Sequence, residues 1–374
     1  MQLSFRVGIF CILYWAASSL AAAVLFEGDI PHLIDGIHLP VEIQGREYLF
    51  LVDTGSTYVV LDERFRDSLG EPYSLRQIST PFEKQWAAYY KPIDAHLGDL
   101  NLNTDNPFLV SDLELLRRSS GIEVYGIIGM SFMHKYAWSI DFEQRKIQIL
   151  DSVELGDVEH VAIAGIHWGQ DSLPYTSVQI GEYERRFLLD TGQQRSVSIA
   201  KRTFEQFVQE DALEPLQKTL SVVIGGVRES AQGRLVGFTL AECEYPELIT
   251  NISIYHSIGF SLFRRHSQVV MDFPKRRLFL NEFIKPLQPD WQDRSRMNFA
   301  RDDDIAMIFA VEAGSPAAQA GIKRWTVLLA VNGQSTEDLS LGEVRDMFKR
   351  PTGTEVKLKL MHRKEVRDVT LTLD

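Results

Sequence analysis

Residues 49–57 of the chain read LFLVDTGST, so one acidic side chain, Asp53, directly follows four apolar residues. A buried carboxylate is costly unless it has hydrogen-bond donors or a raised pKa, so Asp53 needs a partner. Residues 187–192 read FLLDTG and put Asp190 in the same local setting. The two stretches predict that each aspartate is the partner of the other.

The residues around these stretches repeat as well. Alternating Val and Ile before each aspartate predict a strand in both places. Farther along, an apolar pair followed by glycine returns in the second half, with a polar residue, Ser257, in its first position. A module of about 130 residues is therefore written twice. The matched segments are 41–43 with 178–180, 125–132 with 255–262, 139–142 with 270–273, and 146–150 with 277–280.

An Asp-Thr-Gly turn at the end of an apolar strand supplies a carboxylate, a hydroxyl, and a glycine that lets backbone amides approach. Two such turns that meet about a pseudo-twofold axis place their carboxylates side by side, where one proton is shared. Such a pair suits hydrolysis, because the ionised member takes a proton from water while the protonated member polarises a carbonyl. General acid–base help of this kind is worth about 10² to 10⁴ in rate.

These motifs resemble those of the pepsin-like and retropepsin-like aspartic peptidases, over about residues 30–282. The resemblance implies two lobes that contribute Asp53 and Asp190 as the catalytic pair. It also implies that the threonines of the two turns cross-bond to stiffen the pair. The supporting residues predicted in this way are Thr54, Gly55, Ser56, Thr191 and Gly192.

The two turns differ in the residues that come after them. The hydroxyls of Ser56 and Thr57 are expected to bond the outer carboxylate oxygen of the first aspartate. Gln193 and Gln194 stand at the corresponding place in the second copy, so the support of Asp190 is expected to differ.

The resemblance further implies a β-hairpin flap, often with an aromatic residue, that closes the cleft. Three aromatic residues lie in the right interval of the first copy, and the substrate-binding candidates are Trp86, Tyr89 and Tyr90. The alternative is that these rings pack within a sheet. In the second copy, residues 223–227 predict either an equivalent hairpin or a plain turn.

A third unit begins after the proline-containing segment 285–296, which is predicted to be a linker. Residues 314–317 read GSPA, with Ser315 placed to cap a helix and Pro316 at its first position. Together with later glycine turns, this pattern resembles a bacterial PDZ domain over about residues 297–374. Such domains bind an extended peptide at a sheet edge beside a helix, here the one expected at 341–348. The alternative is a purely structural cap on the protease.

The N-terminus predicts export. Arg6 precedes an apolar run over residues 7–20, and three alanines follow, which is typical of a cleaved signal peptide. An uncleaved membrane anchor is the alternative. After cleavage Cys243 would be the one remaining cysteine, which fits a bacterial periplasm better than a eukaryotic secretory lumen.

Composition and motifs exclude other classes of protein. A net charge of −12 and a pI near 5.3 argue against a nucleic-acid-binding surface. The nine histidines are dispersed and no paired-cysteine spacing occurs, so neither a metal nor another cofactor is expected. Serine-nucleophile and phosphate-binding motifs do not occur either.

The sequence as a whole predicts a mainly β chain with two pseudo-twofold related, six-stranded acid-protease-like β-barrel lobes and a C-terminal PDZ domain. The predicted function is an exported aspartic endopeptidase that acts on polypeptides, monomeric because its two lobes pair within one chain. The alternative is an inactive peptide-binding adaptor. The predicted boundaries are 1–23 for the signal peptide, 24–152 and 153–284 for the lobes, 285–296 for the linker, and 297–374 for the PDZ domain.

Overall fold

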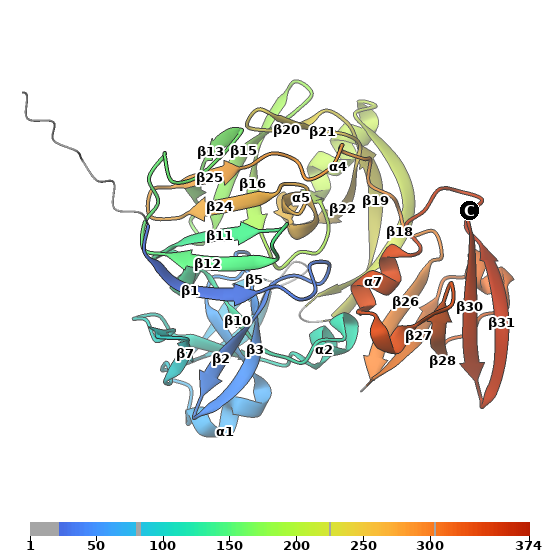
Figure 1. Ribbon diagram of the computed structural model, residues 1–374, viewed down its shortest axis with the longest axis horizontal. Coiled ribbons are helices and arrows are strands. Elements are labelled where there is room, and N and C mark those ends of the chain that lie inside the picture. Colours follow the sequence, from blue (N-terminus) through green and yellow to red (C-terminus); the bar gives the residue numbers. More distant parts are fainter. Residues whose placement is uncertain (1–21, 80–83, 224–225, 303) are drawn as a thin grey trace, which may run out of the picture.

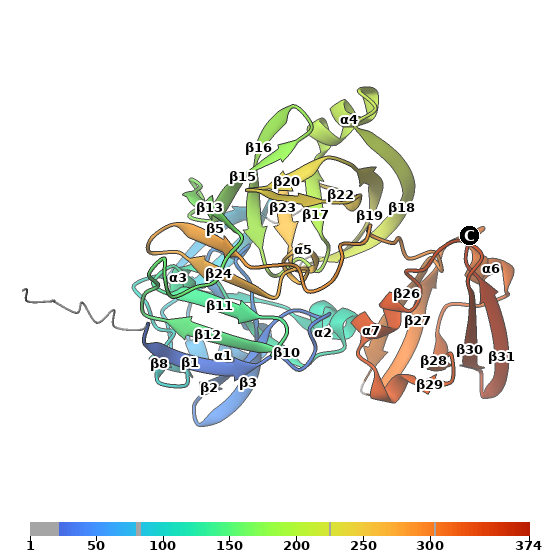
Figure 2. The same cartoon turned by 45° about the horizontal axis from the view of Figure 1, so that its top comes forward.

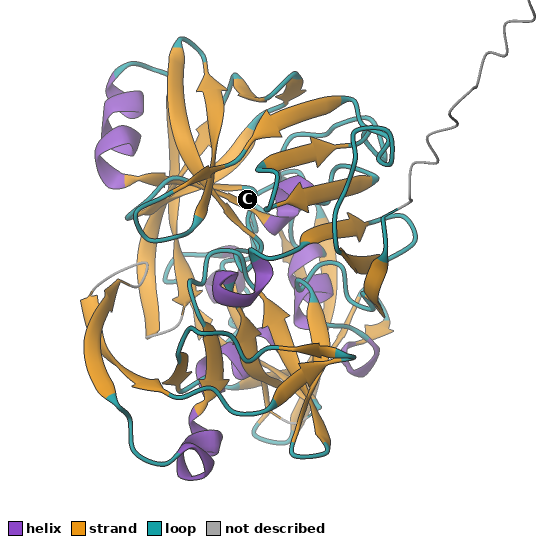
Figure 3. Cartoon of the chain, turned by 90° about the vertical axis from the view of Figure 1, so that its left-hand side faces the viewer, coloured by secondary structure: helices purple, strands orange, loops and turns teal. Residues whose placement is uncertain are grey.

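The computed structural model describes residues 22–79, 84–223, 226–302 and 304–374. Most of the predicted signal segment lies outside these residues. No helix in the described ranges is both long enough and apolar enough to cross a membrane. Strands dominate the molecule, with short helices at the edges of the sheets (Figure 3), so the chain is mainly β, as the sequence predicts.

The first copy forms a nine-stranded sheet in the order β5-β6-β9-β4-β10-β3-β2-β7-β8. Its centre is apolar because β3, β4 and β10 are the Val-, Leu- and Ile-rich segments of the sequence. The strands are β2 (His38–Ile43), β3 (Arg46–Val52), β4 (Val59–Asp62), β5 (Ser74–Ser79), β6 (Lys84–Tyr90), β7 (Ala95–Leu97), β8 (Leu100–Asn101), β9 (Phe108–Ser111) and β10 (Val124–Ile128).

The second copy repeats this order as β18-β19-β22-β17-β23-β16-β15-β20-β21, with β14 (His167–Trp168) added beside β15. The repeat in the sequence is thus a repeat of strand order. The strands are β15 (Pro174–Ile180), β16 (Tyr183–Asp190), β17 (Val197–Ala200), β18 (Leu213–Val223), β19 (Gly226–Leu235), β20 (Phe238–Leu240), β21 (Cys243–Tyr245), β22 (Leu248–Ser253) and β23 (Ser257–Gly259).

A third sheet joins the two copies, in the order β1-β12-β11-β24-β25-β13. At its centre β11 pairs antiparallel with β24, one strand from each copy (Figure 1). Its strands are β1 (Val24–Asp29), β11 (Ala137–Asp141), β12 (Lys146–Leu150), β13 (Ala162–Gly165), β24 (Gln268–Asp272) and β25 (Arg277–Leu280).

The number of strands differs from the expected six per lobe, since the two sheets hold nine and ten. Two kinds of hairpin account for the difference. Each copy has a hairpin that extends the sheet on one side, β5–β6 or β18–β19, and a short one on the other side, β7–β8 or β20–β21. The segment 223–227 is therefore part of a hairpin, and its residues 224 and 225 lie outside the described ranges.

The helices are short and mark one asymmetry between the copies. In the first copy α2 (Glu114–Ser120) lies between β9 and β10, whereas in the second copy only Ile254, Tyr255 and His256 connect β22 to β23. The other helices of the two copies are α1 (Arg66–Leu69), α3 (Met130–Met133), α4 (Lys201–Gln209) and α5 (Phe260–Phe263).

The C-terminal unit has its own apolar core, separate from the core that the two copies share. Ser315 caps α6 by accepting from Ala318 N at 3.1 Å, with Pro316 in the first turn, as predicted. The main strands follow the order β26-β27-β28-β30-β31. The elements are β26 (Met297–Asp302), β27 (Ile305–Val311), α6 (Pro316–Gln319), β28 (Thr326–Val331), β29 (Gln334–Ser335), α7 (Leu341–Asp346), β30 (Glu355–His362) and β31 (Glu365–Thr372).

This unit docks on the first copy through α2, which contacts both β26 and α7 (Figure 2). Arg345 on α7 donates to the carbonyl oxygens of Ser119 on α2 and Phe299 on β26. Gly342 N, in the first turn of α7, donates to Asp35 Oδ1 at 3.0 Å. The sheet edge formed by β26 is thus covered in part by a helix of the first copy.

Candidate functional site

The two Asp-Thr-Gly turns meet where the two large sheets approach each other. Asp53 follows β3, and Asp190 is the last residue of β16. In each copy an apolar strand runs parallel beside the aspartate-bearing strand: β10 beside β3, and β23 beside β16. These equivalent settings bring the two carboxylates to the floor of one cleft.

The threonines of the two turns exchange hydrogen bonds in a symmetric pattern. Thr54 N donates to Thr191 Oγ1 at 3.1 Å, and Thr191 N donates to Thr54 Oγ1 at 3.0 Å. Each hydroxyl also donates to a strand of the other copy, Thr54 to Leu189 O at 2.6 Å and Thr191 to Val52 O at 2.8 Å. Both threonines are buried, so these bonds fix the two turns against each other.

Each carboxylate lies against the glycine of the opposite turn. A Cβ placed on Gly55 would be 2.7 Å from Asp190 Oδ1, and one placed on Gly192 would be 2.5 Å from Asp53 Oδ1. A side chain at either position would therefore overlap the opposite carboxylate. The absence of a side chain at both glycines is what lets the two acids approach.

The pKa values of both acids are raised. Burial, and then the charge of Asp53, raise the pKa of Asp190 well above its ordinary value. Burial also raises the pKa of Asp53, although N–H donors such as Gly55, at 2.8 Å, offset part of this effect. Two buried acids this close together share one proton.

The hydrogen bonds to the outer carboxylate oxygens of the pair differ from the prediction. The Ser56 hydroxyl donates to Tyr58 O at 3.0 Å, and the Thr57 hydroxyl donates to Asp171 O at 3.2 Å, so neither bonds Asp53. The prediction for these hydroxyls was wrong because the bend after the turn brings Tyr58 O near Ser56, and the second copy presents Asp171 O to Thr57. In the second copy Gln193 N donates to Asp190 Oδ1 at 3.1 Å.

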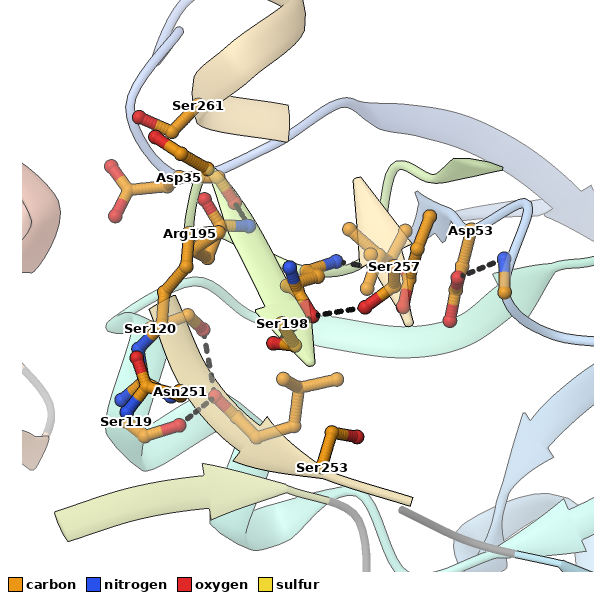
Figure 4. Close-up of a pocket in the computed structure, with 18 of the residues that line it drawn as sticks. Asp35, Asp53, Ser119, Ser120, Arg195, Ser198, Asn251, Ser253, Ser257 and Ser261 are labelled. Atoms are coloured by element: carbon orange, nitrogen blue, oxygen red, sulfur yellow. Dashed lines mark hydrogen bonds between the residues drawn. The ribbon is translucent and has the colours of Figure 1, made fainter. Parts of the chain in front are cut away.

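A cleft of about 1190 Å³ surrounds the two aspartates. Residues of both copies line it, and it continues to the C-terminal unit, where Phe299 and Arg345 are in its wall. Figure 4 shows Asp53 at one side of this space and Asp35 and Arg195 at another. One cavity thus joins the aspartate pair to the edge strand and helix of the third unit.

The flap candidates separate into two groups. Trp86 is 69% exposed and lines the cleft, whereas Tyr89 and Tyr90 are 4% and 1% exposed. Tyr89 packs edge-on against Tyr58, with ring centroids 5.4 Å apart. The hairpin β5–β6 therefore presents Trp86 to the cleft and uses the tyrosines for packing.

Two residues near the aspartates were not identified from the sequence. Tyr255 lines the cleft, and burial, with Asp190 as the next cause, raises the pKa of Tyr255 to about 12. Asp171 lies in the same wall, where its carboxylate accepts from Tyr175 Oη at 2.8 Å. Neither belongs to a motif. The only signal for Tyr255 was its match with Tyr125 in the first copy.

No group of three or more His, Cys, Asp or Glu side chains that could hold a metal ion occurs within the described part of the chain.

Comparisons with known proteins identify two domains. Residues 39–132 match the family model described as aspartyl protease, and residues 307–360 match the one described as PDZ domain. The chain is similar to the probable periplasmic serine endoprotease DegP-like of Chlamydia trachomatis serovar D, with 26% identity over 176 residues, 46% of this chain and 32% of that protein. It thus spans about a third of the length of that relative. A solved structure, the photosystem II D1 C-terminal processing protease, matches with 21% identity over 21% of this chain and 22% of that chain, at a TM-score of 0.20.

Proposed function

We propose that this chain, which carries an aspartyl protease domain and a C-terminal PDZ domain, is an aspartic endopeptidase whose catalytic pair is Asp53 and Asp190. The reciprocal placement of each carboxylate against the opposite glycine is the observation that supports this proposal. In the proposed site one water lies between the two acids and the scissile carbonyl.

In the proposed reaction the ionised member of the pair acts as the general base. It takes a proton from the water, which attacks the carbonyl carbon, while the protonated member donates to the carbonyl oxygen. The threonine bonds hold the geometry, and Gly55, Gly192 and Ser56 support it through backbone N–H groups and close approach. Trp86 on the hairpin contacts the bound polypeptide.

The test exchanges each acid for its amide. Asp53→Asn and Asp190→Asn should each reduce cleavage of a casein-like substrate at least about 10²- to 10⁴-fold, because the amide cannot take up or share the proton. The fold should remain, since the amide keeps the shape of the side chain. Asp94→Asn, at a largely exposed acid, is the matched control and should keep the parent rate. Near-parent cleavage by either dyad variant would refute the assignment.

An adaptor that binds peptides without cutting them is the second candidate. Gln193, in place of a hydroxyl residue after the second turn, favours it, as does the continuity of the cleft with the PDZ domain. An assay from acidic to mildly alkaline pH with a general aspartic-peptidase inhibitor separates the two functions. A binder would show affinity for peptides but no inhibitor-sensitive product.

We also propose that the chain is exported to a periplasm and acts as a monomer, with the domain boundaries predicted from the sequence. One chain supplies both aspartates, and the C-terminal core is separate from the core of the two copies. The mass and N-terminal residue of the purified protein test both ideas. A mature chain that begins near residue 24 and a monomeric mass are the expected results.

A further inference from the structure

In each copy a row of side chains runs across the large sheet, beginning beside the aspartate turn. Neighbouring members are directly paired in the strand register, so they share one face of the sheet. In the first copy the row is Ile127, Val60, Leu109 and Tyr89, on β10, β4, β9 and β6. In the second copy it is Ser257, Ser198, Asn251 and Gln232, on β23, β17, β22 and β19.

The repeated strand order makes these two rows equivalent position by position. All four members of the first row belong to one apolar cluster, and we call it the apolar row. All four members of the second carry a hydroxyl or an amide, and we call it the polar row. The two walls beside the aspartate pair therefore differ in chemistry although they share one architecture.

The connections that lie beside the two rows also differ. In the first copy α2 and the residue before it place Leu116 and Leu113 against the apolar row. The second copy has no helix between β22 and β23. All four members of the polar row line the cleft, where a hydroxyl or amide can meet a ligand.

Two buried amide donors at the polar row lack acceptors. Gln193 Oε1 accepts from the hydroxyls of Ser198 and Ser257, each at 2.8 Å (Figure 4). Asn251 is 1% exposed, and its Oδ1 accepts from Gln232 Nε2 at 3.4 Å. Within the described residues neither Gln193 Nε2 nor Asn251 Nδ2 has a hydrogen-bond partner. Buried donors without acceptors are costly and rare, which points to a ligand that supplies the acceptors.

We infer that the polar row binds an amide side chain, Asn or Gln, of the substrate, and that the enzyme cleaves between this residue and an apolar one. The amide oxygen accepts from Asn251 Nδ2 and Gln193 Nε2. The apolar residue lies against the opposite wall, where Val60, Leu109 and Trp86 line the cleft. This inference rests on the proposed function, because it assigns the residues that flank the scissile bond.

The test uses synthetic octapeptides with Phe-Gln or Gln-Phe at the centre and matched peptides in which Leu replaces Gln. Cleavage is measured with the full-length protein, and binding is measured separately with the Asp53→Asn variant. For one of the two orders, Phe-Gln or Gln-Phe, the Gln peptide should be cleaved and bound about 10-fold or more better than the matched Leu peptide. The reason is that the Leu peptide leaves the amide donors unpaired. Equal or better binding of the Leu peptides, or binding of neither kind, overturns the inference.

Variants at Asn251 test whether the polar row causes the preference for the Gln peptide. Asn251→Leu, which introduces the residue found at the equivalent position of the apolar row, should abolish or reverse the preference. Asn251→Asp keeps the shape but replaces the unpaired donor with an oxygen, and it should also remove the preference. Thr250→Val is the matched control, because this neighbouring side chain is on the other face of β22 and its Oγ1 has no partner in the described chain. A preference that survives both Asn251 variants in folded protein contradicts the inference.

The outcomes separate this inference from the proposed function. Cleavage by the parent that Asp53→Asn abolishes supports the endopeptidase, whichever residues flank the cut. Apolar residues on both sides of every cut would then contradict only the polar row. Absence of cleavage together with preferential binding of the Gln peptide would instead contradict the endopeptidase and the cleavage position, and would support the binding of the amide by the polar row.

Discussion

At the scale of single residues, Asp190 belongs to a coupled pair of buried acids. It is placed beside Asp53 in a site that raises the pKa of both acids, with burial as the first cause for each. A raised pKa in the folded state means that the native chain holds a proton that the unfolded chain releases. The pair therefore stabilises the fold less as the pH rises.

The raised pKa of Asp190 predicts how stability depends on pH. The unfolded pKa of an aspartate is about 3.9. Above that value, up to the raised folded pKa, the parent loses stability relative to Asp190→Asn, which has no such proton to lose. The variant should therefore melt at higher temperature than the parent at pH 7, and the difference should shrink below pH 4. Thermal unfolding at several pH values measures it. A variant that is less stable at pH 7 would show that the ionised pair is better solvated than its burial implies.

The glycine contacts give a second prediction. Gly192→Ala places a methyl group within 2.5 Å of Asp53 Oδ1, so the two turns must separate. Cleavage should fall at least about 100-fold, in the range that general acid–base catalysis supplies.

Gly156→Ala is the control, since no atom lies within 4 Å of the Cβ that it would add. It should retain the parent activity. A Gly192→Ala variant with unchanged turnover would contradict the close approach of the two turns.

The sequence predicted the pairing of these residues because a repeated motif relates positions that are far apart in the chain. Two identical turns with matching flanks predicted that the loops meet, and the structure places them in contact. The bonding of Ser56 and Thr57 was not predictable, because a hydroxyl can donate to a carboxylate or to any carbonyl that the bend brings near. That choice depends on backbone direction, which a local pattern does not contain.

Among the elements, the hairpin β5–β6 contributes Ile78, Trp86 and Ala87 to the wall of the cleft. Trp86 is exposed there, whereas Tyr89 is buried on the sheet. The sequence predicted the interval of the hairpin but could not tell which rings face the substrate, because all three aromatic residues fit a half-buried strand.

This arrangement predicts different outcomes for the two rings. Trp86→Ala should reduce kcat/KM about 10-fold, a change of about 1.4 kcal/mol, without affecting stability. Tyr89→Ala should destabilise the fold by about 3 to 5 kcal/mol, because a buried aromatic ring is lost.

Tyr73→Ala is the control for both, since Tyr73 is 52% exposed and is not part of the cleft wall. Steady-state kinetics and urea unfolding measure the effects. An unstable Trp86→Ala variant with normal kinetics would assign that ring to packing.

The elements that sequence reasoning missed are those that depend on register. Ser198, Asn251 and Gln232 belong to no motif and are far apart in the chain, and only strand pairing aligns them. Ser257 was recognised as a polar exception, but its partners were not. Strand counts were missed for a similar reason, since β18 and β19 contain polar and glycine residues that resemble loops.

At the scale of the whole molecule, α2 is part of the cleft wall and also contacts the PDZ domain. Leu116, Ser119 and Ser120 on this helix line the cleft, and the same helix contacts β26 and α7. PDZ domains bind peptides along a sheet edge beside a helix. We therefore expect a change in the position of the PDZ domain to alter the wall of the cleft.

Arg345 is the side chain that tests this connection. Arg345→Met removes the bonds to Ser119 O and Phe299 O and should weaken the docking of the PDZ domain by about 1.5 to 3 kcal/mol, the value of a hydrogen bond from a charged group. Faster hydrogen exchange in α2 and α7 and faster proteolysis of the linker should follow.

Arg350→Met is the matched control, because Arg350 is exposed and, among the described residues, its hydrogen bonds go to carbonyls of its own domain, those of Asp346 and Lys349. Unchanged exchange in α2 after loss of Arg345 would show that the two units are held together by other contacts.

The pairing of β11 with β24 has a consequence for a shortened chain. These strands are hydrogen-bonded along their whole length, from Ala137 with Asp272 to Asp141 with Gln268. A fragment that ends after the first copy would expose β11 as an unsatisfied edge, and the nearest match for that edge is another β11 in antiparallel orientation. Such a fragment should self-associate as a homodimer in which two Asp53 side chains face each other.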